Sequence, residues 1–325
     1  MANETTDNYT IFYIAAETLI GISAFFGNIM VILAVKLNPG LQNTTFYFIV
    51  SLALADLAVG ILVVPLAIIV TLNMELHFHA CLFMSCLIII LTNASILSLL
   101  AIAIDRYLRI KIPTRYRIVM TSRVIYISIF SVWIVSFLMG IVPMFGWNNR
   151  SNLPKEDQDT LNCTFTSVMS MNYMVYFNTF LWVFLPLLIM LGLYIEIFYL
   201  IRKQMKLQAF SSTGRSSFYG KEYKTAKSLA LVLLFFALSW LPLSILNCVS
   251  FFNPTVNDLD VFQLSLFLAI LLSHANSIMN PIIYAFKIQK LKDAYIRIIK
   301  SCFLQTTVLS DSASNEQTLD EISQE

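Results

Sequence analysis

The chain has 325 residues, of which 58% are hydrophobic and only 12% are charged, about half the charged fraction of an ordinary soluble domain. The formal net charge of +2 is too small to predict a nucleic-acid partner. Five Cys residues are too few for a disulfide-dense secreted scaffold. The composition therefore argues against a soluble globule and favours a membrane protein.

Long apolar stretches follow one another along the chain. Each is about 20 residues or longer, the length of helix that crosses roughly 30 Å of hydrocarbon. The stretches are Ile11–Val35, Phe46–Leu72, Cys81–Ile104, Val124–Phe145, Met171–Ile201, Ala226–Phe252 and Phe262–Phe286. A lone segment in lipid satisfies its backbone only as a helix, and the alternating segments of a membrane β-barrel are absent. We therefore expect an all-α membrane protein, a seven-transmembrane helix bundle over residues 11–286.

The two ends of the chain are more polar than the bundle. Residues 1–10 form a short polar N-terminal tail. Residues 287–301 alternate basic and apolar side chains at helical spacing, which predicts a short amphipathic eighth helix on the membrane surface. Residues 302–325 are polar and acidic, so we expect a disordered tail. Cys302, next to the surface helix, is either a palmitoylation site or an inert thiol.

The basic residues predict how the bundle is oriented. If the N-terminus is outside, only Arg150 and Lys155 of the 21 Lys and Arg residues lie outside, and positive charge concentrates on the cytosolic side. This orientation predicts a plasma-membrane protein with a cytoplasmic C-terminus. The glycosylation sequons at Asn3, Asn8 and Asn149 then face outward. Two further sequons, at Asn43 and Asn93, fall inside or within a span.

Strongly polar residues interrupt the apolar stretches. A charged or amide side chain in a span costs a few kcal/mol on insertion scales, so each needs a partner or a function. The set is Glu17, Asn28, Asp56, Asn93, Asn247, His274, Asn276 and Asn280, with Asp105 and Arg106 at one end of a span. Each residue alone is equally consistent with a simple cross-link between helices.

Together, motifs in all seven stretches resemble those of the rhodopsin-like (class A) G-protein-coupled receptors. They are Gly27-Asn28, Leu52-Ala53-Leu54-Ala55-Asp56, Asp105-Arg106-Tyr107, Trp133, Pro186 with Tyr194, Ser239-Trp240-Leu241-Pro242 and Asn280-Pro281-Ile282-Ile283-Tyr284. The sixth motif usually begins with Cys, so Ser239 is a mild departure. The resemblance implies a receptor that activates a heterotrimeric G protein, with receptor kinases and arrestin acting at the C-terminal tail.

Several residues fit a conformational switch in such a receptor. Pro186, Pro242 and Pro281 each remove a helix hydrogen bond and create a bend. We expect Arg106, beside Asp105, to form a salt bridge with Glu222 that is worth only ~0–1 kcal/mol at an exposed position. By resemblance, opening this bridge frees Arg106 for the G protein while Tyr194 and Tyr284 rearrange.

A second expectation from the resemblance is a sodium site. The residues placed like those of the family's sodium pocket are Asp56, Ser95, Asn276 and Asn280, with Trp240 nearby. Hard oxygen ligands around a carboxylate suit Na⁺. The alternative is that Asp56 is a buried neutral acid.

The third stretch limits the choice of ligand. Amine receptors of this class carry an Asp about seven residues after the Cys, where this chain has Ile88. At the position where the opsins carry the Lys that forms a Schiff base with retinal, this chain has His274, so retinal is also excluded. A small neutral ligand in an apolar cleft with a few polar groups is therefore expected.

The polar groups of that cleft resemble those of the adenosine receptors. By resemblance, Phe165 stacks on adenine, Asn247 reads the edge of the base, Ser273 and His274 contact the ribose, and Thr92 lies near the 5′ end. Glu17 orients His274. Apolar walls are expected from Leu87, Met174, Trp240, Leu243 and Ile270.

The resemblance also assigns Cys81 to a disulfide with Cys163, which fixes the second outer loop over the cleft. His77, His79 and Cys81 alternatively suggest a metal site. Cys86 and Cys248 remain as free thiols.

Within this family, the chain is most similar to the type 3 members, in residues 46–56, 167–169, 173–177 and 237–245 and at Thr166. Asn93 and Asn178 depart from the residues expected in a type 3 pocket. The resemblance implies adenosine as the ligand, inhibitory G proteins (Gi) and lowered cyclic AMP.

Other functions remain open at this point. The serious alternative is a class A receptor for another neutral ligand, such as a different nucleoside or a lipid. A transporter or channel would predict internal repeats and interrupted helices in matching halves, which the sequence lacks. An enzyme would need a catalytic constellation, and none can be assembled from three His residues without a phosphate loop or elbow serine. No cofactor is expected apart from allosteric Na⁺.

Overall fold

The computed structural model describes residues 2–41, 44–154, 158–209 and 216–301. Within these ranges, 7 helices are long and apolar enough to cross a membrane. They are Thr10–Leu37, Thr44–Thr71, Phe78–Lys111, Ser122–Gly140, Tyr173–Lys206, Glu222–Phe252 and Asp260–Lys287. The predicted seven-helix bundle is confirmed.

The elements follow one another along the chain with short connections. The longer helices are α1 (Ala2–Leu37), α2 (Thr44–Ala58), α3 (Val64–Thr71), α4 (Phe78–Lys111), α6 (Ser122–Gly140), α8 (Leu185–Ala209), α9 (Ser216–Phe252) and α10 (Asp260–Lys287). Two short helices are α5 (Tyr116–Val119) and α7 (Phe165–Val168). Two π-helical segments, Val59–Val63 and Tyr173–Phe184, precede α3 and α8. Turns of 3₁₀ helix span Pro39–Leu41, Val142–Phe145, Arg150–Asn152 and Pro254–Asp258.

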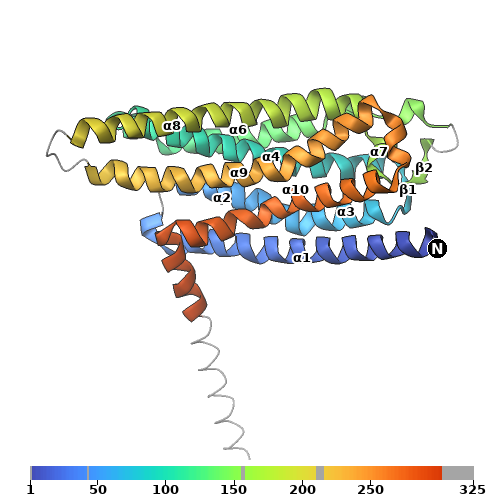
Figure 1. Ribbon diagram of the computed structural model, residues 1–325, viewed down its shortest axis with the longest axis horizontal. Coiled ribbons are helices and arrows are strands. Elements are labelled where there is room, and N and C mark those ends of the chain that lie inside the picture. The colour runs from blue at the N-terminus through green and yellow to red at the C-terminus, as the bar shows by residue number, and fades with distance from the viewer. Residues whose placement is uncertain (1, 42–43, 155–157, 210–215, 302–325) are drawn as a thin grey trace, which may run out of the picture.

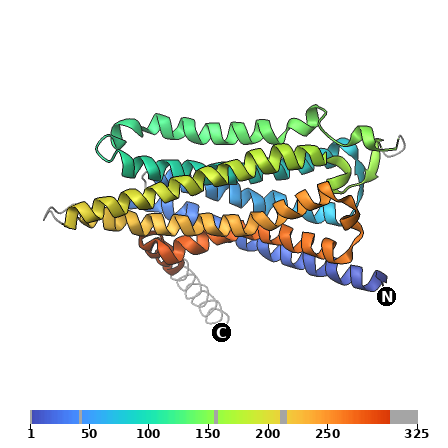
Figure 2. The ribbon, with the colours of Figure 1, turned by 45° about the horizontal axis from the view of Figure 1, so that its top comes forward.

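The long helices lie side by side in one bundle (Figures 1 and 2). Two strands, β1 (Glu75–His77) and β2 (Thr160–Asn162), pair antiparallel with Leu76 opposite Leu161. They lie at the same end as the N-terminus and α7 (Figure 1). We call this the disulfide end, because it holds the Cys81–Cys163 bond, and the opposite end the arginine end, because it holds Arg106.

Prolines mark the irregular parts of the helices. Pro186 follows the π-helical segment Tyr173–Phe184, and Pro65 follows Val59–Val63. A proline lacks the amide hydrogen of a regular turn, and a π-helical turn before it changes the pairing of the preceding carbonyls. Pro242 and Pro281 lie inside α9 and α10, and α9 changes direction along its length (Figure 1).

Some boundaries differ from those expected. The first helix begins at Ala2, within the segment expected as a tail. The third span continues to Lys111 instead of ending at Ile104, because Asp105 and Arg106 find partners inside the bundle and do not end the helix. The fourth ends at Gly140 and not at Phe145, because Pro143 cannot continue the hydrogen-bond ladder and the chain forms a 3₁₀ turn.

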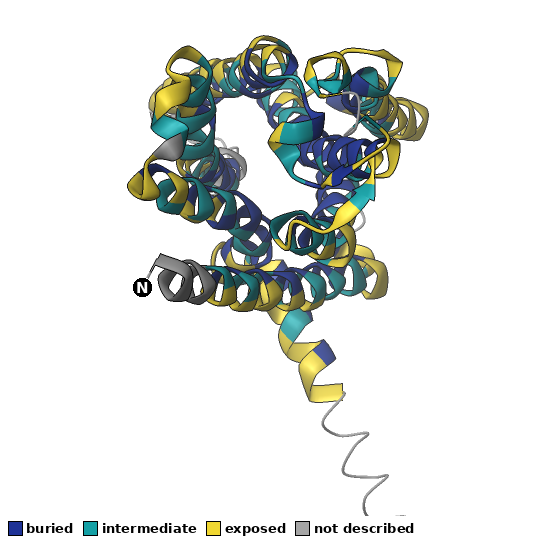
Figure 3. Cartoon of the chain, turned by 90° about the vertical axis from the view of Figure 1, so that its right-hand side faces the viewer, coloured by how far each residue is buried: buried dark blue, intermediate teal, exposed yellow. Residues whose placement is uncertain are grey.

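Residues that face the interior of the bundle are mostly buried. Figure 3 views the bundle from the disulfide end, with exposed residues mostly on its outer faces. Exposed apolar side chains on several helices, such as Phe26, Phe130 and Ile195, are the surface expected to face lipid.

The segment after α10 forms the predicted surface helix over residues 289–301. It turns away from the bundle axis (Figure 1). Its residues Leu291, Ala294 and Ile298 are buried in the main apolar cluster of the bundle, while Lys292 and Arg297 are exposed. Cys302 and the tail 302–325 lie outside the described residues.

Close approach of two helices generates a first prediction. A Cβ at Gly140 of α6 would contact the Ile90 side chain and lie 2.9 Å from the Ile90 backbone nitrogen in α4. Gly140→Ala should therefore destabilise the solubilised protein by about 1–3 kcal/mol through overpacking, measured as a lower melting temperature. Gly192 of α8 has no atom within 4 Å of such a Cβ, so Gly192→Ala should be neutral or slightly stabilising. Equal melting temperatures for the two variants would contradict this account of the α4–α6 contact.

Candidate functional site

A cavity of about 190 Å³ opens among the helices near the disulfide end. Residues of α1, α3, α4, α7, α9, α10 and the π-helical segment Tyr173–Phe184 line it. The predicted site residues in the lining are Thr92, Phe165, Met174, Trp240, Leu243, Asn247, Ile270, Ser273 and His274. The lining is mostly apolar with a few polar groups, which is typical of a pocket for a small neutral molecule.

Two predicted residues lie outside this lining. Leu87 packs against the buried cluster of Val59, Val63 and Leu91, and none of these residues lines the cavity. Glu17 lies behind His274 and contacts its imidazole.

The Glu17–His274 pair links α1 to α10. Nδ1 of His274 lies 2.7 Å from Oε1 and 3.0 Å from Oε2 of the Glu17 carboxylate. Glu17 is fully buried and His274 is nearly so, and a buried carboxylate needs such a partner. Because the carboxylate holds Nδ1, Nε2 is the ring nitrogen left for a ligand in the cavity. Glu17 is thus placed to orient His274, as predicted.

The loop before the fifth span places Phe165 at the cavity. The predicted disulfide joins Cys81 at the start of α4 to Cys163 after β2. The hydroxyl of Thr164 accepts from the Ser167 amide and the Ser167 hydroxyl accepts from the Thr164 amide, a capping box that starts α7 at Phe165. Since the Cys81 sulfur is in a disulfide, it is not available as the metal ligand considered with His77 and His79. Cys86 and Cys248 are free.

Asp56 forms the centre of a buried polar cluster in the middle of the bundle. Its carboxylate accepts from Ser95 Oγ at 3.0 Å, Ser277 Oγ at 3.1 Å and Asn280 Nδ2 at 2.7 Å. Asp56 is fully buried. Ser277 was missed in the sequence, where Asn276 was expected; among the described hydrogen bonds to Asp56, none comes from Asn276. The carboxylate and the two serine hydroxyls are hard oxygen donors that fit a small cation.

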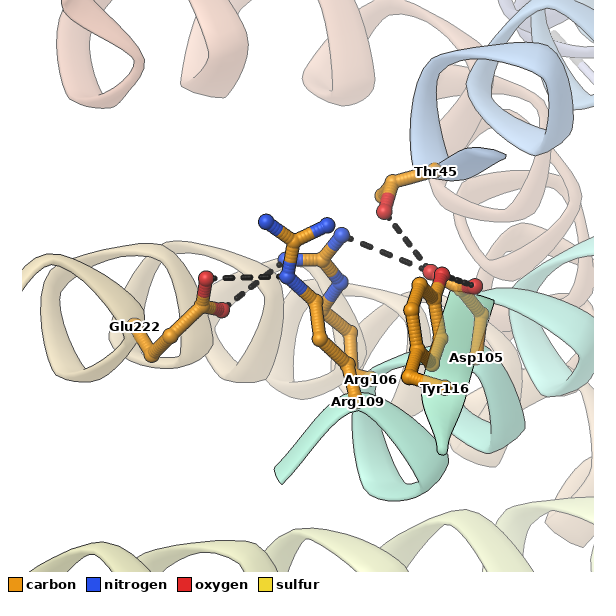
Figure 4. A network of polar contacts seen from close by, with 6 residues as sticks. All are labelled: Thr45, Asp105, Arg106, Arg109, Tyr116 and Glu222. Atoms are coloured by element: carbon orange, nitrogen blue, oxygen red, sulfur yellow. Dashed lines mark hydrogen bonds and ion pairs between the residues drawn. The ribbon is translucent and has the colours of Figure 1, made fainter. Parts of the chain in front are cut away.

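At the arginine end, a network joins α4 to α9 and α2 (Figure 4). Nη1 of Arg106 lies 3.3 Å from Oε2 of Glu222, and Nη2 of Arg106 lies 3.4 Å from Oδ2 of Asp105. Arg109 donates to the other Glu222 oxygen at 2.9 Å. Thr45 and Tyr116 donate to Asp105, and burial and the negative charge of Asp105 raise the pKa of Tyr116 to about 12. Two arginines of α4 therefore share one carboxylate of α9 as a counter-ion, and Asp105 supplies a second negative charge beside Arg106.

This geometry corrects the energy expected for the Arg106–Glu222 bridge. The two side chains are only 5% and 8% exposed, so the value for an exposed pair does not apply. Removing one partner of a buried pair costs about 3–5 kcal/mol, because the other charge remains buried. Arg109 was missed although it follows Arg106 by three residues and so shares its helix face; no pattern in the sequence pointed to Tyr116.

The other predicted switch residues are also inside the bundle. Tyr194 of α8 and Tyr284 of α10 are buried. The Tyr284 hydroxyl has no hydrogen-bond partner among the described residues. Pro242 lies in α9 two residues after Trp240, which lines the cavity. The cavity and the arginine network are therefore connected by α9, which contributes Trp240 and Asn247 to one and Glu222 to the other.

The predicted glycosylation sites have different surroundings. Asn149 donates from its amide to the backbone carbonyls of Thr166 and Ser167 at 3.4 and 3.3 Å. Asn3 and Asn8 lie in the first turns of α1, where the structure does not describe side chains. Modification of all three stays a prediction.

The architecture and these residues define a seven-helix receptor. A family model described as "7 transmembrane receptor (rhodopsin family)" matches residues 27–284, and the chain belongs to this family.

More specifically, the chain is similar to curated adenosine receptors. It is 54% identical over 317 residues to "Adenosine receptor A3" of Ovis aries, which covers 97% of this chain and 98% of the relative. It is 54% identical to that of Bos taurus (94% and 95% covered) and 53% identical to that of Canis lupus familiaris (94% and 96% covered). This is a family of receptors and not of enzymes.

Proposed function

We propose that this chain is an adenosine receptor of the plasma membrane that activates inhibitory G proteins and lowers cyclic AMP. The observation that carries the proposal is the cavity, in which Phe165, Asn247 and the pair of Ser273 and His274 meet. A purine nucleoside needs an aromatic face to stack on its ring, an amide to bind its base edge and an imidazole to contact its sugar. The similarity to receptors named for adenosine supports the same ligand.

The orientation follows from charge. We propose that the disulfide end faces outward and the arginine end faces the cytosol, since the basic residues concentrate at the latter. Adenosine then enters from outside, and the G protein contacts the opposite end of the same helices. With this orientation the C-terminal tail is proposed to be cytosolic, where receptor kinases and arrestin act, and Cys302, which follows the surface helix in the sequence, is proposed as an acylation site.

The ligand proposal is tested by cyclic AMP in cells that express the chain. Adenosine should lower stimulated cyclic AMP, and pertussis toxin should abolish this response. Asn247→Ala and Phe165→Ala should each raise the adenosine concentration for half-maximal response about tenfold or more, because each removes about 1–3 kcal/mol of base contact. Asn253→Ala, in an exposed loop outside the cavity lining, is the matched control. An unchanged half-maximal concentration in the cavity variants would refute this pocket, and no response of the native chain to adenosine would favour a receptor for another neutral ligand.

The arginine network is proposed to hold the resting state. Separation of α9 from α4 exposes Arg106 to the G protein, and Glu222 opposes that separation. Gln keeps a carbonyl oxygen that can accept from Arg106 or Arg109, so Glu222→Gln incurs only part of the cost of an unpaired buried arginine. A loss of ~1 kcal/mol shifts a two-state equilibrium about fivefold, so ligand-independent nucleotide exchange on the G protein should rise at least about three- to tenfold. Glu196→Gln is the control, because its bridge to Lys111 is half-exposed and ties α4 to α8 instead. A basal rate in Glu222→Gln no higher than in the control would refute this role.

Sodium is proposed to bind at Asp56 and favour the resting state. Asp56, Ser95 and Ser277 supply its oxygen ligands, with Asn280 holding the carboxylate. NaCl should weaken agonist binding relative to choline chloride at equal ionic strength, and Asp56→Asn should remove this difference. Asp159→Asn, on a carboxylate that is 80% exposed at the disulfide end, should retain it. Full sodium sensitivity in Asp56→Asn would exclude the site.

A further inference from the structure

One more glycosylation sequon lies at the disulfide end, in addition to those named above. Residues 162–164 read Asn-Cys-Thr, which supplies the acceptor Asn, a middle residue other than Pro and a Thr at the third position. Asn162 is the last residue of β2 (Figure 1). It directly precedes Cys163, whose sulfur forms the disulfide with Cys81. A sugar acceptor and one half of the disulfide are therefore neighbours in a single triplet.

The folded loop leaves the Asn162 side chain free. Side chains alternate between the two faces of a strand, and in β2 Leu161 is buried while Thr160 and Asn162 are exposed. Glu75, opposite Asn162 on β1, is exposed as well. Apart from the strand pairing, the hydrogen bond of Asn162 among the described residues uses its backbone carbonyl, which accepts from the Ser167 hydroxyl at 3.5 Å. A glycan on the side-chain nitrogen therefore displaces no described contact.

Asn149 offers a contrast within the same loop. Its Nδ2 donates to the carbonyls of Thr166 and Ser167, and its Oδ1 accepts from Asn152 at 2.7 Å. An unmodified amide has two N–H groups, and an attached sugar replaces one of them. A glycan at Asn149 therefore costs the loop a hydrogen bond, whereas a glycan at Asn162 costs none.

The other two residues of the triplet are engaged in the folded loop. Cys163 is fully buried, and its amide donates to the Met74 carbonyl at 2.8 Å. The Thr164 hydroxyl accepts from the Ser167 amide at 3.2 Å in the capping box that starts α7. An enzyme that reads the triplet must reach both the Asn amide and the Thr hydroxyl, and the folded loop presents only the first. Sugar transfer must therefore come before the loop folds and the disulfide closes.

We propose that Asn162 carries an N-linked glycan, and that this glycan is attached before Cys163 pairs with Cys81. The inference rests on the outward orientation of the disulfide end in the proposed function. It adds a modification site and an order of two covalent steps to that function.

The first step needs a lipid-linked oligosaccharide diphosphate as the sugar donor. Nδ2 of Asn162 attacks the anomeric carbon of the first sugar, so that an N–C bond forms while the C–O bond to the diphosphate breaks. The lipid diphosphate leaves, and the amide gives one proton to a base of the transferase. In the second step, the thiols of Cys81 and Cys163 are oxidised by exchange with the disulfide of an oxidoreductase, which is reduced to a dithiol. The same oxidising compartment supports both steps.

The site is tested on the full chain expressed in mammalian cells. A triple variant with Asn3→Gln, Asn8→Gln and Asn149→Gln should keep one glycan, seen as a single mobility shift that peptide N-glycosidase removes. Adding Asn162→Gln should abolish the shift. Release in heavy-oxygen water should convert position 162 to a labelled Asp, detected by mass spectrometry. Asn253→Gln is the matched control, because Pro254 blocks its Asn-Pro-Thr triplet. Transfer occurs on the growing chain, so the result does not require any variant to fold.

The order is tested by pulse-chase labelling of the triple variant, with free thiols trapped by N-ethylmaleimide at successive times. The glycan should appear on chains whose Cys163 is still alkylated. Chains that already hold the disulfide without the glycan should not gain it during the chase. Cys81→Ser leaves Cys163 without its partner and should retain the glycan at Asn162.

Each result decides a different claim. A triple variant without sugar, on cells that expose an epitope added before Met1, would overturn the inference while the orientation stands. Sugar gained by chains that already hold the disulfide, or lost in Cys81→Ser, would overturn the order. An epitope hidden on intact cells would refute the orientation and the inference with it. Asn162 is not in the cavity lining, so Asn162→Gln should leave the half-maximal adenosine concentration within about twofold.

Discussion

Hydrocarbon offers no partner to a hydrogen-bonding group, and this constraint determines most of the structure. Each spanning segment must satisfy its own backbone and therefore forms a helix. A strongly polar side chain within a span is costly unless it has a partner, and several find one on a neighbouring helix. Glu17 finds His274, Asp56 finds Ser95, Ser277 and Asn280, and Asn93 finds Asn178. The polar side chains thus hold the bundle together and form its candidate sites.

The helices were predictable for the same reason, because the apolar stretches allow only one backbone arrangement. Their ends were less predictable, since charge alone does not end a helix. Asp105 and Arg106 continue α4 because Thr45, Tyr116 and Glu222 neutralise or bond them. Conversely, the apolar run after Gly140 does not continue α6, since Pro143 interrupts it.

The candidate site was predictable where a residue type restricts its own environment. A buried acid and a buried imidazole on different helices each need a hydrogen-bond partner, and Glu17 and His274 do contact each other. Contacts that depend on how each helix is rotated about its axis could not be predicted in this way. Ser277 instead of Asn276 reaches Asp56, and Ile88 instead of Leu87 lines the cavity, because one residue along a helix rotates a side chain by about 100°.

The sharing of Glu222 by two arginines has an electrical consequence. While α9 lies against α4, both guanidinium groups have the same counter-ion. When the helices part, one negative charge leaves and both guanidinium groups lose this shared partner in the same step, while Asp105 stays beside Arg106. A low-dielectric opening focuses such a field and attracts acidic groups from a distance. A transducer whose docking end is rich in carboxylates would thus be drawn to the opened bundle before it touches any side chain.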